Sequence, residues 1–88
     1  MIYQRIEFSK TFEKGFKKLT PSQKNRFYDR LSLFEQDPLS RILRNHALKG
    51  KWVGYRSIDI AGDLRALYYN DGEKIVIFAF IGSHSRLY

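Results

Sequence analysis

Side chains suited to phosphodiester chemistry are concentrated in the C-terminal half of the chain. The sequence has two histidines, His46 and His84, and both lie in this half next to predicted turns. Histidine serves as a general acid or base near neutral pH, and RNA can be cut without a metal when a base, a cation and an acid act together. Arg86 and Tyr88 accompany His84 in a short polar tail, which favours a functional role for His84. His46 could equally be an ordinary loop residue.

Two arginines occupy corresponding positions on neighbouring predicted strands. Arg56 begins an alternating pattern with Ile58 and Ile60, and Arg65 begins a similar pattern in the next strand. A guanidinium group binds phosphate through a planar fork of donors, so the two arginines predict a cationic rim that holds phosphate. Asp63, in the turn before Arg65, is either a carboxylate for acid–base chemistry or simply a turn former.

Basic and aromatic side chains also alternate in the segment before these strands. Lys49 and Lys51 flank Gly50 and lead into Trp52 and Tyr55. This interleaving suits single-stranded RNA, because aromatic rings stack on unpaired bases while cations contact phosphate. The alternative for Trp52 is a core position beneath a solvated loop.

The composition limits the possible functions. The chain has 88 residues and a formal charge of +7, which predicts a polyanionic partner such as nucleic acid or an acidic protein. It has no cysteine, no glycine-rich phosphate loop and no metal-spaced histidine group, so we expect neither a cofactor nor a metal. No apolar run approaches the roughly 20 residues of a membrane span, and no secretory signal is present. We therefore expect one soluble, cytoplasmic domain at residues 1–88 that makes no membrane contact.

The elements that must position these side chains can be predicted from apolar periodicity and capping signals. Ser9 is a predicted N-cap, and Thr20-Pro21-Ser22-Gln23 is a capping box that starts a second helix. Asp37-Pro38 ends that helix. The expected elements are a strand at residues 2–7, helices at 9–18 and 21–36, an irregular segment at 39–51 with a short edge strand near residue 48, and strands at 53–60, 64–69 and 74–81.

These elements predict an α+β fold. With only two residues between them, the helices should form an antiparallel hairpin. We expect this hairpin, after an N-terminal strand, to pack on one face of a curved, mainly antiparallel sheet of about four strands. The strand at 74–81 is almost continuously apolar, which indicates a central position. The other face of the sheet, or its rim, is left for a ligand.

The sequence resembles toxins of the RelE/ParE superfamily over essentially its whole length, and most of all the YafQ-type mRNA interferases. The segments that carry the resemblance are Asn45-His46-Ala47-Leu48-Lys49-Gly50, Gly54-Tyr55-Arg56, Gly62-Asp63-Leu64-Arg65-Ala66-Leu67-Tyr68, and Ile81-Gly82-Ser83-His84 through Leu87-Tyr88. The resemblance implies a RelE-like fold and a ribosome-dependent, metal-independent endoribonuclease that cleaves mRNA in the ribosomal A site through attack by the 2′-hydroxyl. It also implies a cognate antitoxin, with the toxin monomeric when alone and hetero-oligomeric when bound.

The resemblance also implies roles for individual residues. His46, Asp63 and His84 fall where YafQ-type toxins place catalytic groups, and Tyr88 falls on their C-terminal aromatic. Arg65 matches the arginine that RelE-type toxins use at the scissile phosphate, and Lys49 and Lys51 match basic positions that those toxins direct at RNA. The chain departs from the YafQ pattern at Asp59, where that type has a histidine, and at Phe80, where it has an arginine.

Together, the residues and the resemblance define one predicted site. The predicted catalytic residues are His84, Asp63, His46 and Arg65. The predicted RNA-binding residues are Arg56, Lys49, Lys51, Tyr88, Arg86 and Trp52. We expect His84 to be the general acid, Asp63 or His46 to be the base or to orient another group, and Arg65 with Arg56 to hold phosphate.

Two other functions are compatible with the same fold. One is a toxin-like protein without nuclease activity that acts through antitoxin binding and co-repression of its own operon. The other is a ParE-type gyrase poison, which is disfavoured because that branch lacks the histidine-bearing C-terminal pattern.

Overall fold

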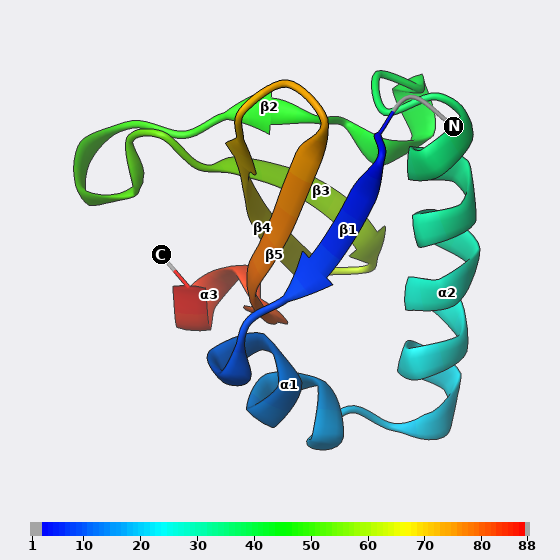
Figure 1. Ribbon diagram of the computed structural model, residues 1–88. Coiled ribbons are helices and arrows are strands. Elements are labelled where there is room, and N and C mark those ends of the chain that lie inside the picture. Colours follow the sequence, from blue (N-terminus) through cyan, green and yellow to red (C-terminus); the bar gives the residue numbers. More distant parts are fainter. Residues whose placement is uncertain (1–2, 88) are drawn as a thin grey trace.

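The structure, a computed structural model, describes residues 3–87. A five-stranded sheet carries two helices on one face and a short third helix at the end of its last strand (Figure 1). The helices and strands are β1 (Arg5–Phe8), α1 (Lys10–Lys17), α2 (Pro21–Gln36), β2 (His46–Ala47), β3 (Arg56–Ala61), β4 (Leu64–Asp71), β5 (Ile75–Ser83) and α3 (His84–Leu87). Two short 3-10 helices, η1 (Arg41–Leu43) and η2 (Gly50–Trp52), lie on either side of β2.

The sheet confirms the predicted α+β class and its mainly antiparallel pairing. The strands follow the order β1-β5-β4-β3-β2, with β1 parallel to β5 and every other neighbouring pair antiparallel. There are five strands rather than about four, because both β1 and the two-residue β2 join the sheet. The central position predicted for β5 is confirmed, since β1 and β4 flank it. The expected polar tail instead forms α3.

Both predicted helix starts are confirmed by their caps. The backbone N–H of Phe12 donates to Ser9 Oγ at 3.0 Å, and the Ser9 hydroxyl itself donates to the carbonyl of Ala79 at 2.8 Å. At the second helix, Gln23 N–H donates to Thr20 Oγ1 at 3.1 Å, and Thr20 N–H donates to Gln23 Oε1 at 2.9 Å. These local bonds satisfy backbone donors that a helix start leaves free. The Ser9 bond to the sheet also fixes where α1 begins relative to β5.

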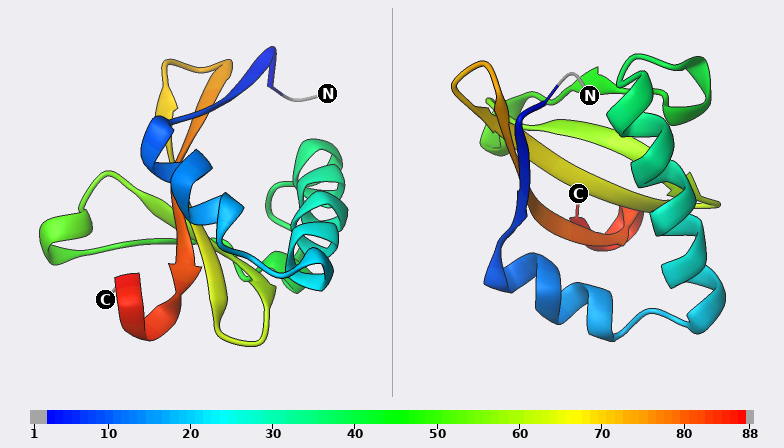
Figure 2. Two further views of the ribbon diagram at one scale, coloured as in Figure 1. Left: turned by 90° about the horizontal axis from the view of Figure 1, so that it is seen from below. Right: turned by 45° about the vertical axis from the view of Figure 1, so that its right-hand side comes forward.

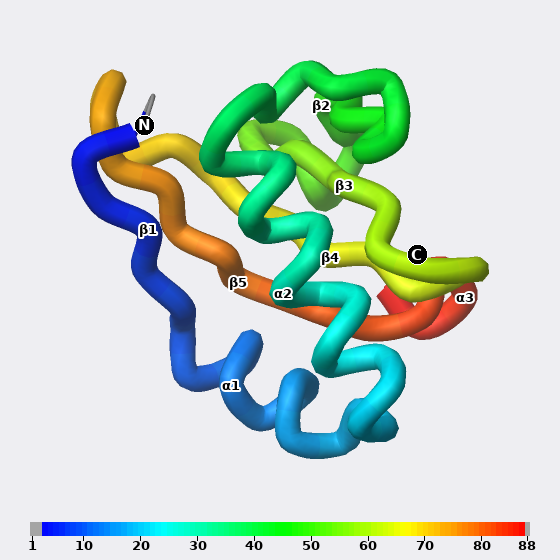
Figure 3. Tube along the Cα trace, turned by 90° about the vertical axis from the view of Figure 1, so that its right-hand side faces the viewer, coloured from blue at the N-terminus to red at the C-terminus, as the bar shows by residue number. Residues whose placement is uncertain are grey.

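The two helices are more open than the antiparallel hairpin expected from their short connection. Figures 1 and 2 show α1 running across the direction of α2, and Figure 3 shows both helices on the same face of the sheet. The expectation of a hairpin was wrong because α1 packs on β5, whereas α2 packs on β3. Ring contacts of Phe27 with Phe12 at 5.3 Å and Phe16 at 5.6 Å join the helices across the angle between them.

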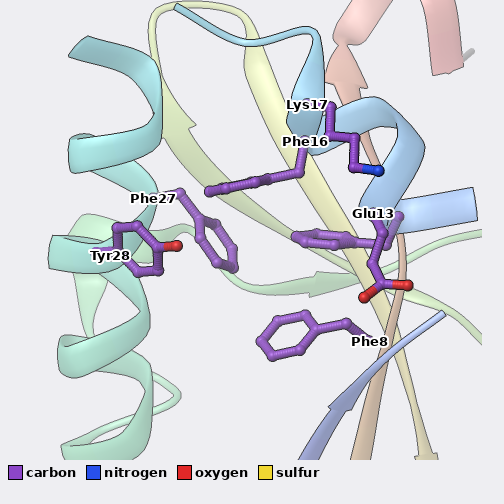
Figure 4. Close-up of a pocket in the computed structure, with 7 residues that line it drawn as sticks. Phe8, Glu13, Phe16, Lys17, Phe27 and Tyr28 are labelled. Carbon is purple, nitrogen blue, oxygen red and sulfur yellow. The ribbon is translucent and has the colours of Figure 1, made fainter. Parts of the chain in front are cut away.

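An aromatic core fills the space between the helices and the sheet. Phe34 of α2 meets Tyr68 of β4 edge to face at a centroid distance of 5.0 Å and Phe78 of β5 at 5.4 Å. Each such pair adds to the stabilisation from burying the ring. The core opens at one end into a pocket of about 260 Å³ between β1, α1 and α2, where Phe8 and Tyr28 are partly exposed (Figure 4).

A β-bulge in β5 decides which side chains leave this core. Leu67 pairs with Phe80 and the next residue, Tyr68, pairs with Phe78, so Ala79 is an extra residue in β5. Before the bulge Phe78 faces the helices, and after it Ile81 does. Phe80 therefore turns to the opposite face, because an extra residue reverses the alternation. The bulge explains how an almost continuously apolar strand covers both faces.

The turns lie near their predicted positions. The predicted strand at 64–69 extends to Asp71, and Gly72 in the turn that follows has φ of 79°, which glycine adopts without strain. Within residues 3–87, no helix has the length and apolar character needed to cross a membrane.

Candidate active site

Three of the predicted catalytic residues meet at one end of the sheet, where β4 begins and β5 ends. Arg65 lies opposite Gly82 in the β4–β5 register, two residues before His84. The backbone N–H of His84 donates to the carbonyl of Asp63 at 2.7 Å, which fixes the start of α3 against the β3–β4 turn. Local pairing therefore holds Asp63, Arg65 and His84 next to one another in the backbone, although they are up to 21 positions apart in sequence.

The Arg65 side chain is held in a defined position on the sheet face opposite α1 and α2. Its Nε lies 3.0 Å from Asp59 Oδ1, and its Nη1 donates to the carbonyl of Gly62 at 2.8 Å and of Leu64 at 3.2 Å. Both charged side chains are largely covered, at 18% and 20% exposure. Within residues 3–87 no hydrogen bond of Nη2 is found, so this nitrogen remains available to a phosphate oxygen.

Asp59 is the central carboxylate of this face, and sequence reasoning missed that role. Besides Arg65, it has Arg44 Nε 3.7 Å from its Oδ2. Arg44 adopts the left-handed region, with φ of 47°, at the end of η1. The signal was present in the sequence, because a hairpin centred on Gly62 places Asp59 opposite Arg65. Two guanidinium groups therefore share one carboxylate, which leaves a net positive charge for an anion.

Arg56 lies on the other face of the sheet from Arg65, so the expected rim formed by the two arginines was wrong. Arg56 is opposite Tyr68, which belongs to the helix-facing core. The register places Arg65 three positions before Tyr68, and an odd separation reverses the face. Arg56 Nε instead donates to Asn45 Oδ1 at 2.8 Å. The Asn45 amide in turn donates to Tyr68 Oη and to the carbonyl of Pro38, each at 2.8 Å.

His46 shares a face with Arg65 but lies two strands away. It pairs with Ser57, and Ser57 alternates with Asp59 on the face that carries Arg65. The exposed His46 ring has Nδ1 2.8 Å from the carbonyl of Arg44. The structure thus places His46 on the same surface as the Asp59–Arg65 pair, without bringing it to the end of the sheet where His84 lies.

Trp52 is a packing residue on this face rather than a free stacking platform. Its ring lies 4.9 Å from that of Phe80 and 5.5 Å from that of Tyr55, and its Nε1 donates to the carbonyl of Leu87 at 3.0 Å. The core alternative for Trp52 is therefore favoured. Lys51 Nζ lies 5.7 Å from the Trp52 ring centre. The bond to Leu87 joins the η2 loop to α3, both of which lie on the side away from α2 (Figure 2).

The other predicted RNA-binding residues lie around this surface. Lys49 and Arg86 are exposed, on the loop before η2 and on α3 respectively. Tyr88 lies outside the described residues. Close to Arg65 and His84, a cleft of about 740 Å³ is lined in part by their neighbours Asp63, Gly82 and Ser83.

The side chains of the site are suited to acid–base chemistry on a bound anion. It combines imidazole, carboxylate and guanidinium groups, which can move a proton and stabilise negative charge on phosphorus. In the described part of the chain, no cluster of three or more His, Cys, Asp or Glu side chains could hold a metal ion.

Comparisons with known proteins agree over nearly the full chain. Residues 4–88 match the family described as "Bacterial toxin of type II toxin-antitoxin system, YafQ". The mRNA interferase toxin YafQ of Escherichia coli K12 is 28% identical over 92 residues, covering 100% of this chain and 99% of the relative. A crystal structure of YafQ from E. coli BL21(DE3) has a TM-score of 0.80 at 28% identity, covering 97% of this chain and 99% of that one. The E. coli DinJ-YafQ toxin-antitoxin complex gives a TM-score of 0.78 at 26% identity, covering 100% and 99%.

Proposed function

The chain belongs to the YafQ family of bacterial toxins from type II toxin–antitoxin systems, and from this premise we propose that it is an mRNA interferase. It acts as a single domain in the cytoplasm and cleaves mRNA in the ribosomal A site. The reaction needs no metal, because the nucleophile is the 2′-hydroxyl of the substrate itself. The family membership and the mRNA interferase activity named for the E. coli relative support this proposal.

The observation that carries the proposal is the meeting of Asp63, Arg65 and His84 where β4 begins and β5 ends. A base removes the 2′-hydroxyl proton, the 2′-oxygen attacks phosphorus, and the 5′-oxygen leaves with a proton from an acid. The products are a 2′,3′-cyclic phosphate and a 5′-hydroxyl. His84 is the proposed acid and Arg65 the group that stabilises charge on the phosphate.

Asp63 is the better candidate for the base or orienting group. Its carbonyl accepts from the His84 backbone, whereas His46 lies two strands from Arg65. His46 lies on the same sheet face as Arg65, so it is placed to contact the RNA on the side of the Asp59–Arg65 pair away from His84. Asp59 positions the Arg65 guanidinium and takes up part of its charge, while Arg44 restores a net positive charge.

The proposed protein partner is a cognate antitoxin. The E. coli relative is described in complex with its antitoxin DinJ. A chain with a formal charge of +7 favours an acidic partner that covers its basic surface. We propose that the toxin is monomeric when alone and hetero-oligomeric with the antitoxin.

Cleavage of ribosome-bound mRNA by the purified protein tests the function. We expect the wild type to cut mRNA on programmed ribosomes equally well with and without EDTA, as read by primer extension. His84→Gln should slow cleavage by about 10²- to 10⁴-fold, which is the usual contribution of general acid–base catalysis. Lys74→Gln is the surface control, because Lys74 is exposed at the opposite end of the β4–β5 hairpin.

The opposite result would identify one of the alternatives. If the wild-type protein arrests growth while ribosome-bound mRNA stays intact, the nuclease proposal fails. A supercoiling assay with purified gyrase then tests the ParE-type activity, and a promoter-binding assay with antitoxin tests co-repression.

A further inference from the structure

A cleft beside the proposed active site carries basic side chains of α1 that have no role in the scheme above. The cleft of about 740 Å³ runs between α1, the start of α2, the β3–β4 turn and α3. Among residues 3–87, its lining includes three cations, Lys14, Lys18 and Arg86, and one carboxylate, Asp63. We call it the basic cleft.

The position of the two lysines depends on an unusually close approach of α1 to β5. A Cβ atom added to Gly15 would lie 2.7 Å from the carbonyl oxygen of Ile81 and 3.2 Å from its Cγ2. Glycine is otherwise unfavourable inside a helix. Gly15 therefore allows α1 to rest directly on the end of β5, and this contact brings Lys14 and Lys18 to the edge of the site.

The charges of the basic cleft are not used to hold the fold together. Lys14, Lys18 and Arg86 are exposed, and no ion pair of theirs is found within residues 3–87. Lys14 and Lys18 are four positions apart on one helix face, where like charges repel. Three unneutralised cations around one hollow therefore point to an anionic ligand.

We propose that the basic cleft binds backbone phosphates of an RNA strand next to the scissile phosphate. This inference rests on the proposed function. Asp63, Gly82 and Ser83 line the cleft and adjoin Arg65 and His84 in the backbone, so a strand with its scissile phosphate at Arg65 reaches the cleft by passing around this end of the sheet. The face beyond Arg65 is filled by the packed rings of Trp52 and Phe80. Contacts to phosphate alone hold the strand without reading its sequence.

Salt-dependent binding of RNA tests the proposal. The probe is a fluorescein-labelled single-stranded RNA oligonucleotide, bound by the full chain carrying His84→Gln so that it stays intact. Loss of two phosphate contacts in Lys14→Gln/Lys18→Gln should lower the slope of log affinity against log salt by about 1.4, because each contact contributes roughly 0.7. The matched control is Lys10→Gln/Lys17→Gln, which removes two exposed charges of α1 that do not line the basic cleft, and its slope should stay unchanged.

The same variants on empty ribosomes separate the two possible sources of RNA. A change with the free oligonucleotide assigns the cleft to the mRNA strand, and a change confined to ribosomes assigns it to ribosomal RNA. Only the first outcome supports a site next to the scissile phosphate, and the second would overturn it. Equal slopes for the two double variants on both probes would overturn the proposal, as would a loss confined to antitoxin binding. Thermal unfolding of Lys14→Gln/Lys18→Gln should occur at or slightly above the wild-type temperature, since a like-charge pair is removed.

Failure of this inference can be told apart from failure of the proposed function. If the wild type does not cleave ribosome-bound mRNA but the Lys14→Gln/Lys18→Gln slope falls, the basic cleft stands and the nuclease proposal does not. If cleavage depends on His84 and the slope is unaffected, only the basic cleft is wrong.

Discussion

Replacing Arg65 with lysine separates the charge of this residue from its geometry. The guanidinium makes one bond to Asp59 and two to the carbonyls of Gly62 and Leu64. A lysine ammonium keeps the charge but cannot reach all three acceptors, so about two hydrogen bonds are lost. At roughly 0.5–1.5 kcal/mol each, Arg65→Lys should lower the free energy of unfolding by about 1–3 kcal/mol. Cleavage should fall by about 10²- to 10³-fold, the usual loss for one donor to a developing oxyanion.

Urea unfolding and primer extension measure the two effects of Arg65→Lys in parallel. Trp52 is the only tryptophan, and it packs against Phe80 on the face that carries Arg65, so its fluorescence reports unfolding directly. Asp59→Asn is the comparison variant, because it weakens the ion pair while the carbonyls of Gly62 and Leu64 still hold the guanidinium. It should be destabilised but should keep most of its cleavage activity. An unfolding free energy for Arg65→Lys within about 0.5 kcal/mol of wild type would refute the hydrogen-bond argument. Undiminished cleavage by the same variant would refute the phosphate role.

Three further predictions concern the rest of the fold. Asn45→Ala removes an amide that is bonded to Tyr68 Oη and to two other partners. The free energy of unfolding, measured with urea, should therefore fall by about 1–3 kcal/mol. A fall of less than about 0.5 kcal/mol would show that these hydrogen bonds do not stabilise the fold. Burial, and secondly the neighbouring Tyr68, raise the pKa of Tyr3 above 10.0, so the folded state holds this proton more tightly and stability falls as pH rises past that value. Between pH 9 and pH 11 (about one unit on either side of that value), the free energy of unfolding of Tyr3→Phe should therefore fall less than that of the wild type. Equal falls for the two proteins, measured by urea unfolding at each pH, would contradict this prediction. Gly15→Ala places a methyl group against the backbone of Ile81. The cost of overpacking, about 1–3 kcal/mol, should outweigh the gain of about 1 kcal/mol in helix propensity, so the melting temperature should fall. A raised melting temperature would show that α1 can shift away from Ile81.

Features that depend on neighbouring residues were predictable from the sequence. The Ser9 cap and the Thr20–Gln23 capping box form between residues three positions apart, and both helices begin where these signals lie. The candidate site was predictable in part for the same reason, because Asp63 and Arg65 flank a single strand start and the resemblance supplied His84.

The tertiary structure decided which of these residues face one another. Arg56 and Arg65 have similar surroundings in sequence, yet the β3–β4 register sends them to opposite faces, because an odd separation along paired strands reverses the side-chain direction. The sheet order likewise leaves His46 two strands from Arg65, and an extra residue at Ala79 turns Phe80 toward Trp52.

The sequence by itself therefore determined the positions of the two long helices and the main strands, the basic character of the surface and the kinds of chemical groups available. Caps, turns and charge are set by residues close together in the chain. Strand register, sheet order and the packing of α1 on Ile81 are set by contacts between distant segments. These contacts alone brought Asp63, Arg65 and His84 to one end of the sheet and placed Lys14 and Lys18 beside them.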